Sequence, residues 1–340
     1  MIMKNVLLNK KGIYRENNFI KVGSFKQNPL YMGIDKLSFI CDIESKLECW
    51  DIYDKFRFLT KEKSNEYYIK KVRGKNYRSN VKITSKENSN FYLLVSYDPV
   101  NKNSLPNVRF ELSPQYGKNN DIFNIVEWLK DTIGRNTISQ LFKKARVTRI
   151  DLTVDIHSKK FITNYYFSIS KAKTGTHFKN NRDDCKNNYA IGSKRSQLYL
   201  LVYEKTKLYT SEDYKDDLIS VKEQDIKERI TRLELRIKPK NKDKEYQLSK
   251  LSKLQNPFRI INIYSQNLVE NRLNGFLPFL QQEKVLPKAV TRYLETQNGS
   301  SRYNRAVLNE ILDGCQSKYR LDIDWTKWKD IVRILEPFYK

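Results

Sequence analysis

Segments with the residue alternation of β-strands occur in two sets, and the sets follow one another in the same order along the chain. In each set an Ile-Asp strand comes first, a Tyr-Leu-Leu-Val strand follows, and a strand of the pattern Arg-x-Glu-Leu comes last. The paired segments are 34–35 with 150–151, 92–98 with 199–204, and 108–112 with 231–235. This repetition predicts an α+β fold: a large, mainly antiparallel sheet made of two related halves with flanking helices. Chance similarity among short strand patterns is the alternative interpretation.

The rest of the chain divides around this sheet. Residues 1–30 are polar and basic around short apolar patches, which predicts a loosely packed, basic N-terminal arm. A sheet domain is expected at 31–240, with its two halves at about 31–134 and 145–240. Beyond Pro239 the apolar spacing becomes helical, so 241–340 is predicted to be a helical C-terminal region. Its helices are expected at 243–254, 257–277, 286–294, 302–312 and 326–335.

The composition is strongly basic. The 340 residues include 64 Lys and Arg against 39 Asp and Glu, which gives a formal net charge of +25. Such a charge predicts a polyanionic partner, with nucleic acid the first candidate and an acidic membrane surface the second. Aromatic residues make up 12% of the chain, which is too many for a disordered basic tail. We therefore expect a folded protein whose surface follows a nucleic-acid backbone.

Neither a membrane span nor a disulfide framework is expected. The chain has no run of about 18 apolar residues, and its first residues lack the apolar stretch of a secretory signal. The cysteines show no C-x-x-C spacing, so a zinc site is not expected and reduced thiols are the default. They are Cys41, Cys49, Cys185 and Cys315. These features predict a cytoplasmic protein.

Two strands separate polar from apolar residues by face. Alternate positions of 149–156 and 231–238 are apolar and are expected in the core, whereas the positions between them carry charges. The charged residues are Arg149, Asp151, Asp155, Arg232, Glu234 and Arg236. If both strands lie near 197–204, the carboxylates share one surface and suit a hard divalent cation, Mg²⁺ or Mn²⁺. The alternative is a solvated face of Arg–carboxylate pairs, although Asp is disfavoured in strands.

A basic turn precedes a strand that carries two tyrosines. The turn contains Lys194 and Arg195 after a glycine and a serine. In the following strand Tyr199 and Tyr203 point to one face, as does Lys205. A cationic turn beside such a strand suits the binding of a phosphodiester and its attack by a phenolic oxygen. The alternative is an ordinary amphipathic strand after a basic turn.

A metal ion on this surface would polarise a phosphate and help a phenol ionise from its ordinary pKa of about 10. Arg149, Arg232 and Lys194 are the candidates to stabilise the charge that develops on the phosphate. Only two histidines occur, His157 and His177, too far apart in sequence for a His-x-His metal motif. Any metal site is therefore expected to be carboxylate-based. His157 is interpreted as a satisfied strand-end histidine, with a peripheral metal ligand as the alternative.

These residues resemble the motifs of the Rep_trans family of replication initiators. The similar segments are 34–39, 149–155, 191–196, 202–205 and 231–236. The family includes rolling-circle plasmid initiators, some filamentous-phage initiators and relaxases of integrative conjugative elements. The resemblance covers about residues 30–240. It implies a nicking-closing enzyme that cuts one DNA strand at an origin hairpin and leaves a 3′ hydroxyl for a polymerase to extend.

The resemblance also implies roles for individual residues. Tyr203 matches the tyrosine that becomes joined to the 5′ phosphate, and Tyr199 is the reserve candidate. Asp151, Asp155 and Glu234 match acidic positions of the family and are the candidate metal ligands. The candidates for DNA contacts are Lys194, Arg195, Lys205 and Arg236.

The expected partners are an origin hairpin with a single-stranded nick site, a host helicase, and a second copy of the chain. The C-terminal region would read the origin sequence or contact a partner. Three alternatives stay open. One is a conjugative-element relaxase with the same chemistry, another is a non-catalytic DNA-binding regulator, and the third is an RNA-binding protein.

Overall fold

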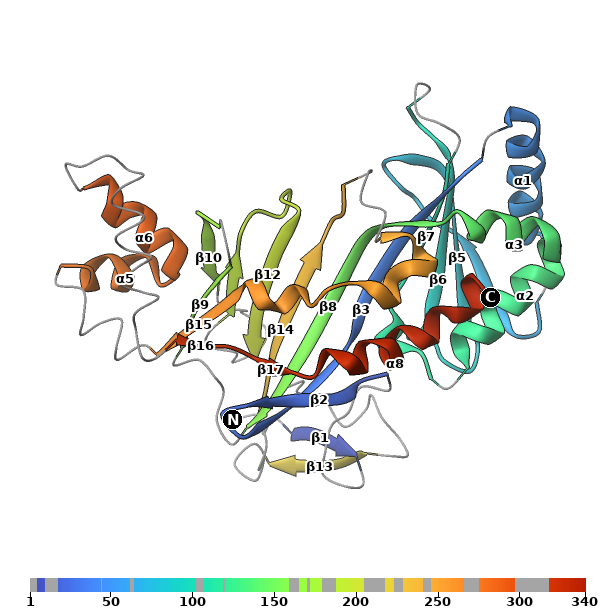
Figure 1. Cartoon of the computed structure of the whole chain (residues 1–340). Coiled ribbons are helices and arrows are strands. Elements are labelled where there is room, and N and C mark those ends of the chain that lie inside the picture. The colour runs from blue at the N-terminus through green and yellow to red at the C-terminus, as the bar shows by residue number, and fades with distance from the viewer. Residues whose placement is uncertain are drawn as a thin grey trace.

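Long antiparallel strands dominate the structure (Figure 1). The computed structural model describes residues 5–9, 18–43, 45–61, 64–101, 107–118, 120–158, 165–169, 172–178, 188–204, 218–222, 229–240, 246–265, 275–296 and 318–340. Most strands in these ranges belong to one 12-stranded sheet. A separate pairing joins β1 (Asn5–Asn9) to β13 (Leu218–Lys222).

The strand order of the large sheet follows the chain order in two halves. β3 (Asn28–Asp42) begins the first half and lies near the centre of the whole sheet, and the strands after it return toward it from the edge. These are β4 (Tyr67–Lys71), β5 (Tyr77–Ser85), β6 (Tyr92–Pro99) and β7 (Asn107–Leu112).

The second half repeats this order around β8 (Arg146–Ser158). Its returning strands are β10 (Gly175–Phe178), β11 (Asn188–Ile191), β12 (Leu198–Glu204) and β14 (Arg229–Ile237). β3 and β8 are antiparallel neighbours, so the whole order is β10-β11-β12-β14-β8-β3-β7-β6-β5-β4. The predicted α+β fold with a sheet of two related halves is confirmed.

The pairing register places the glutamates of the two halves at equivalent positions. Glu111 of β7 lies opposite Ser38 of β3, and Glu234 of β14 lies opposite Thr153 of β8. Each central strand therefore presents a small hydroxyl residue to the same glutamate position. This is the pattern that a twofold repetition about the β3–β8 boundary produces.

Helices cover one face of the first half (Figure 1). They are α1 (Lys46–Leu59), α2 (Asp121–Ile133), α3 (Arg135–Lys143), α8 (Trp328–Val332) and the 3₁₀ segment η7 (Arg333–Phe338). Phe39 of β3 points to them, with ring centroids 5.9 Å from Phe142 of α3 and 5.2 Å from Phe338 of η7. Its ring also lies 5.3 Å from that of Phe110 on β7. Strand residues between these core positions point the other way, to what we call the polar face of the sheet.

A small sheet completes the core of the second half. It contains β9 (Tyr165–Ile169), β15 (Ile261–Ser265) and β16 (Lys318–Tyr319). Phe167 and Ile263, which pair between β9 and β15, are buried in the same hydrophobic cluster as Leu200 and Leu235 of the large sheet. A second cluster lies where α5 (Leu277–Glu283) and α6 (Leu286–Glu295) pack against each other and the small sheet.

Two boundaries differ from the sequence prediction. The N-terminal arm was predicted to reach residue 30, but β2 (Ile20–Phe25) pairs with β3, and Leu30 is fully buried. The C-terminal region contains strands as well as helices. Ile261 and Ile263 bury alternate side chains in β15, where a helix over 257–277 was predicted, so β-branched alternation prevails there.

The remaining C-terminal elements are short. The predicted helix over 286–294 corresponds to α6, and the one over 243–254 is reduced to the 3₁₀ segment η4 (Leu248–Lys253). The predicted helix at 302–312 lies outside the described residues. This region also contains η5 (Pro257–Ile260), β17 (Asp322–Ile323), which pairs with β2, and η6 (Trp325–Lys327).

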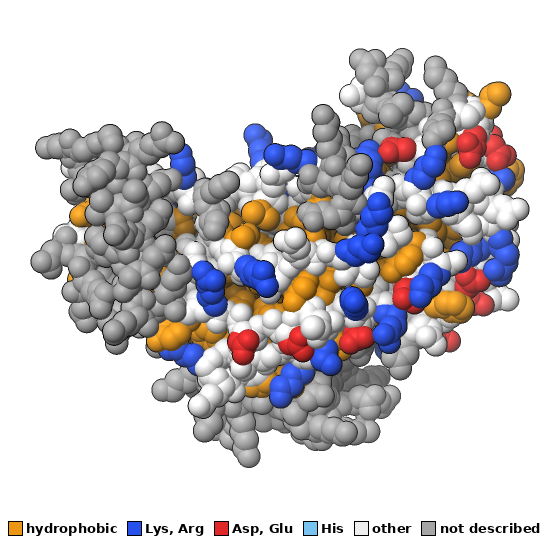
Figure 2. Space-filling view, in the orientation of Figure 1, with side chains coloured by type: hydrophobic (Ala, Val, Ile, Leu, Met, Phe, Trp, Pro, Cys, Tyr) orange, Lys and Arg blue, Asp and Glu red, His pale blue; other side chains and the backbone are white. Residues whose placement is uncertain are grey.

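The surface seen from the helix-covered side is mixed in charge. Figure 2 shows Lys and Arg side chains spread over this side with Asp and Glu among them, and not gathered in one patch. Within the described ranges, no helix is long and apolar enough to cross a membrane.

Removing the Phe39 ring tests the helix-covered core. We expect Phe39→Ala to lower the free energy of unfolding by about 3–5 kcal/mol, because three aromatic neighbours lose their partner. Urea unfolding followed by circular dichroism measures the loss. The matched control is Phe123→Ala, whose ring is 51% exposed and should cost no more than about 0.5 kcal/mol. Equal losses in both variants would contradict the central position of Phe39.

Candidate metal centre

A β-bulge positions the first carboxylate of the site. The register of β3 with β8 shifts between Ile34 and Lys36, so Asp35 is an extra residue on its strand. Ile34 and Leu37 are both fully buried in the core although they are three residues apart. Regular alternation cannot give that spacing, but a bulge can, because it lets both intervening residues reach the polar face.

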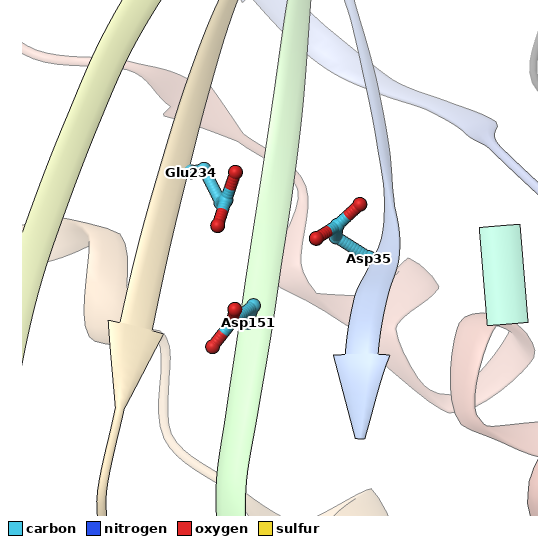
Figure 3. Close-up of side chains that lie close together, drawn as sticks. All are labelled: Asp35, Asp151 and Glu234. Atoms are coloured by element: carbon cyan, nitrogen blue, oxygen red, sulfur yellow. The ribbon is translucent and has the colours of Figure 1, made fainter. Parts of the chain in front are cut away.

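Three carboxylates from three adjacent strands meet on the polar face (Figure 3). Asp35 of β3, Asp151 of β8 and Glu234 of β14 each offer an oxygen, and these oxygens lie within 4.8 Å of one another. Asp151 is fully buried and Glu234 is 8% exposed. Oxygens on opposite sides of Mg²⁺ are about 4.2 Å apart, since each metal–oxygen distance is about 2.1 Å. The donor set fits a hard divalent cation, which a small closure of the three side chains would accommodate.

Two arginines contact the carboxylate cluster. Nε of Arg149 lies 2.9 Å from Oδ1 of Asp151. Arg236 bridges two members, with Nε 3.3 Å from Oδ1 of Asp151 and Nη2 3.6 Å from Oε1 of Glu234. Burial, with the charges of Asp35 and Asp151, nevertheless raises the pKa of Glu234 to about 7. A carboxylate that retains a proton for these reasons is suited to exchange it for a divalent cation.

The two candidate tyrosines lie in different surroundings. The Tyr203 hydroxyl donates a hydrogen bond to Oε2 of Glu234 at 3.5 Å, and burial raises the pKa of this phenol above its ordinary value. Tyr199 is 4% exposed, and the guanidinium of Arg236 lies 5.3 Å from its ring centroid. Burial raises the pKa of Tyr199 as well. Only Tyr203, of these two, contacts a carboxylate of the cluster.

The structure does not bring Asp155, predicted as a metal ligand, into the group of three carboxylates. Asp155 is instead paired with Arg232, which was predicted to stabilise charge on the phosphate. They form a buried ion pair with two contacts of 2.6 Å, Nε to Oδ1 and Nη2 to Oδ2. Nη1 of Arg232 donates to Oε1 of Gln115 in η1 (Pro114–Tyr116) at 2.9 Å, and Phe19 stacks on the guanidinium. Asp155 lies four residues beyond Asp151, about 13 Å along the strand, so sharing a face did not bring them together.

The residues predicted to contact DNA divide into three groups. Lys194 and Arg195 are exposed at the turn between β11 and β12, where Gly192 has a φ of +89° that glycine adopts without strain. Arg236 bridges two carboxylates of the cluster. Lys205 lies outside the described residues. His157 is buried with its ring 4.6 Å from that of Tyr31, which agrees with a strand-end histidine in the core.

In the first half the residue equivalent to Glu234 is Glu111, and basic side chains neutralise its charge. Glu111 receives Nζ of Lys36 at 2.5 Å, Nη2 of Arg109 at 2.5 Å and the Ser38 hydroxyl at 2.9 Å. Burial opposes ionisation, but the hydrogen bond and charge of Lys36 hold the pKa of Glu111 below its ordinary value. The first half therefore carries a satisfied carboxylate where the second half carries Glu234 with two acidic neighbours.

The sequence analysis missed Asp35 as a member of the cluster. Its signal was present, because Ile34-Asp35 repeats Ile150-Asp151 in the paired strands. The repeat identified two equivalent strands, but nothing in the sequence stated that these strands would be neighbours. That adjacency is what unites the aspartates.

Comparisons with models of protein families and with curated proteins find no match to this chain. The fold and the site therefore define its class: an α+β protein with a candidate carboxylate metal centre and a tyrosine beside it. Any more specific function rests on the chemistry of these residues.

Asp35→Asn tests the composition of the cluster. We expect at least a tenfold loss of Mn²⁺ affinity, because one of three charged ligands becomes a neutral amide. Isothermal titration calorimetry on the purified chain measures it. Asp42→Asn is the matched control on the same strand, since Asp42 pairs with Arg146 and is not part of the cluster. Unchanged affinity in Asp35→Asn would remove Asp35 from the site.

The pH dependence of metal binding follows from Glu234. Its pKa of about 7 means that below neutral pH the metal must displace a proton, so affinity falls as pH falls. Mn²⁺ affinity should rise about fivefold from pH 6 to pH 7 and level off above it, as expected for one proton released per ion. Glu234→Gln should bind more weakly and lose this dependence. An affinity that is flat in the wild-type chain would contradict the raised pKa.

Proposed function

We propose that this chain is a DNA strand nicking-closing enzyme, a rolling-circle replication initiator that works through a 5′-phosphotyrosine intermediate. One observation carries the proposal: the Tyr203 hydroxyl donates to Glu234 within a group of three carboxylates suited to a divalent cation. The formal charge of +25 supports a polyanionic substrate. The order of the motifs, which resembles that of the Rep_trans initiators, supports the specific reaction.

The proposed reaction exchanges one ester for another. The Tyr203 oxygen attacks the scissile phosphorus, its proton is released to water, and the bond from phosphorus to the 3′ oxygen breaks. The released 3′ oxygen takes up a proton and becomes a hydroxyl. Religation is the reverse, in which the 3′ hydroxyl attacks the phosphotyrosine and the phenol regains its proton. No net energy source is required, because one phosphoester replaces another at each step.

The residues around Tyr203 have distinct parts in this proposal. Asp35, Asp151 and Glu234 would hold Mg²⁺ or Mn²⁺, which supplies charge stabilisation on the phosphate and lowers the pKa of the phenol. Arg149 holds Asp151 in place, and its side chain is 24% exposed, so it is available to a phosphate oxygen. The exposed Lys194 and Arg195 would contact the DNA backbone.

The proposal has consequences beyond the site. It implies a cytoplasmic protein that acts on an origin hairpin, with a host helicase to open the duplex and a second copy of the chain as an expected partner. A relaxase of a conjugative element would use the same residues, and its DNA substrate would differ. The buried environment of Tyr203 favours one rival, a DNA-binding regulator without catalysis, because burial raises the pKa of the proposed nucleophile.

Tyr203→Phe separates these functions. Incubated with supercoiled origin DNA and Mn²⁺, the wild-type chain should form a covalent protein–DNA adduct that survives a denaturing gel. Tyr203→Phe should form none yet bind the origin with nearly unchanged affinity, since only the attacking oxygen is removed. Tyr199→Phe is the matched control and should retain the adduct. Tight origin binding with no adduct in any metal would favour the regulator.

A further inference from the structure

A strip of basic and aromatic side chains crosses the polar face of the first half. In β4 the core positions Tyr67 and Ile69 alternate with Tyr68 and Lys70, and in β5 Lys82 lies between the buried Val81 and Ile83. Strand pairing aligns these residues with Tyr92 and Leu94 of β6. We call this set the polar strip; its members are Tyr68, Lys70, Lys82, Thr84, Tyr92 and Leu94.

Two lysines of the polar strip lie opposite each other, and neither is paired with an Asp or Glu side chain among the described residues. Lys70 of β4 lies directly opposite Lys82 of β5. Among the described residues neither ammonium forms an ion pair, and Lys82 instead lies over the ring of Tyr92 with Nζ 4.2 Å from its centroid. Like charges at directly opposite positions destabilise a sheet. An anion bound between them would remove this repulsion.

Protection of the sheet edge does not explain the pair. Lysine on an edge strand prevents pairing with other chains, and β4 is the edge strand, so Lys70 has that simple reason to be there. Lys82 lies on β5, which is paired on both sides. Its charge on the polar face therefore needs another cause.

Aromatic rings lie beside these cations. Tyr68 is 56% exposed, with Nζ of Lys86 5.2 Å from its ring centroid. Tyr68 and Tyr92 lie opposite the same residue, Thr84, from its two sides, so they are about 9.5 Å apart across two strand spacings. Tyr68 is exposed and Tyr92 half-buried, and tyrosines interleaved with lysines on a sheet are suited to stacking unpaired bases and binding their phosphates.

The strip is continuous with the candidate metal centre. Leu94 of β6 lies opposite Glu111 of β7, which is bound by Arg109 and by Lys36 of β3. Lys36 in turn lies opposite Asp151 of the carboxylate cluster. From β4 to β8 the distance is about 24 Å, five strand spacings, and basic side chains occur on β4, β5, β7 and β3 along the way.

We propose that the polar strip binds single-stranded DNA and leads one strand across the sheet to the carboxylate cluster. That the DNA strand leads to the carboxylate cluster rests on the proposed nicking function. The strip itself is a binding site in its own right. A single strand is the occupant that uses both the rings and the lysines, because paired bases in a duplex leave no faces for Tyr68 to stack on.

Anisotropy of a fluorescein-labelled oligo-dT of about 20 nucleotides tests the strip, with EDTA present so that no strand is cut. Lys70→Ala/Lys82→Ala should weaken binding about tenfold and make the plot of log affinity against log salt shallower by about 1.4, as expected when two phosphates are no longer neutralised. Tyr68→Ala should weaken binding about tenfold without changing this slope. Tyr68→Phe keeps the ring and should bind oligo-dT with the affinity of the wild type.

The control carries the same change in charge at another place. Lys250→Ala/Lys253→Ala removes two exposed lysines of η4, and it should leave affinity within about twofold of wild type. Equal losses in both double variants would overturn the strip, as would unchanged binding in Lys70→Ala/Lys82→Ala. Binding of wild-type chain to a matched duplex or to oligo-U more tightly than to oligo-dT would overturn single-stranded DNA as the occupant.

Failure of the strip and failure of the nicking function give different results. Loss of oligo-dT binding in the strip variants, with no adduct ever formed by Tyr203, would retain the binding site and reject nicking. An adduct that forms in the wild-type chain, with oligo-dT binding insensitive to the strip, would retain nicking and reject the strip. Thermal unfolding of each variant confirms that the fold is unchanged.

Discussion

The pairing of β3 with β8, interrupted by the bulge at Asp35, is the constraint on which the candidate site depends. A shift of one residue in a strand moves every following side chain to the other face. Without the extra residue, Ile34 and Leu37 could not both enter the core, and Asp35 could not join Asp151 on the polar face. The same irregularity therefore secures the hydrophobic core on one side of the sheet and completes the carboxylate cluster on the other.

The polar face contains two groups of buried acids that differ in how their charge is matched. Asp155 is paired with Arg232 through two short contacts, so its buried charge is matched within the protein and needs no ligand. Glu234 lies beside Asp35 and Asp151, and burial together with the charges of these two acids raises its pKa to about 7. Perturbed groups of this kind are concentrated at functional sites.

The two halves use one architecture for different surfaces. Ser96 of β6 lies opposite Arg109, whereas the equivalent residue of β12, Tyr203, lies opposite Arg232. The first half thus has no phenol at the position where the second half has one, and its glutamate, Glu111, is neutralised. The polar face of the first half therefore carries the basic and aromatic residues of the polar strip. The acidic cluster and Tyr203 lie at the β3–β8 boundary and in the second half.

Residue alternation is a local property, so the strands, their two faces and the repetition of Ile-Asp, Tyr-Leu-Leu-Val and Arg-x-Glu-Leu were predictable from the chain alone. Alternation likewise predicted that Asp151, Glu234 and Tyr203 would share a face. Which acids meet depended on the folded sheet, because strand order and register are set by long-range pairing. That pairing brought Asp35 into the cluster and placed Asp155 in an ion pair with Arg232. β15 also depended on the fold, through burial against the large sheet, since its apolar spacing suited a helix as well.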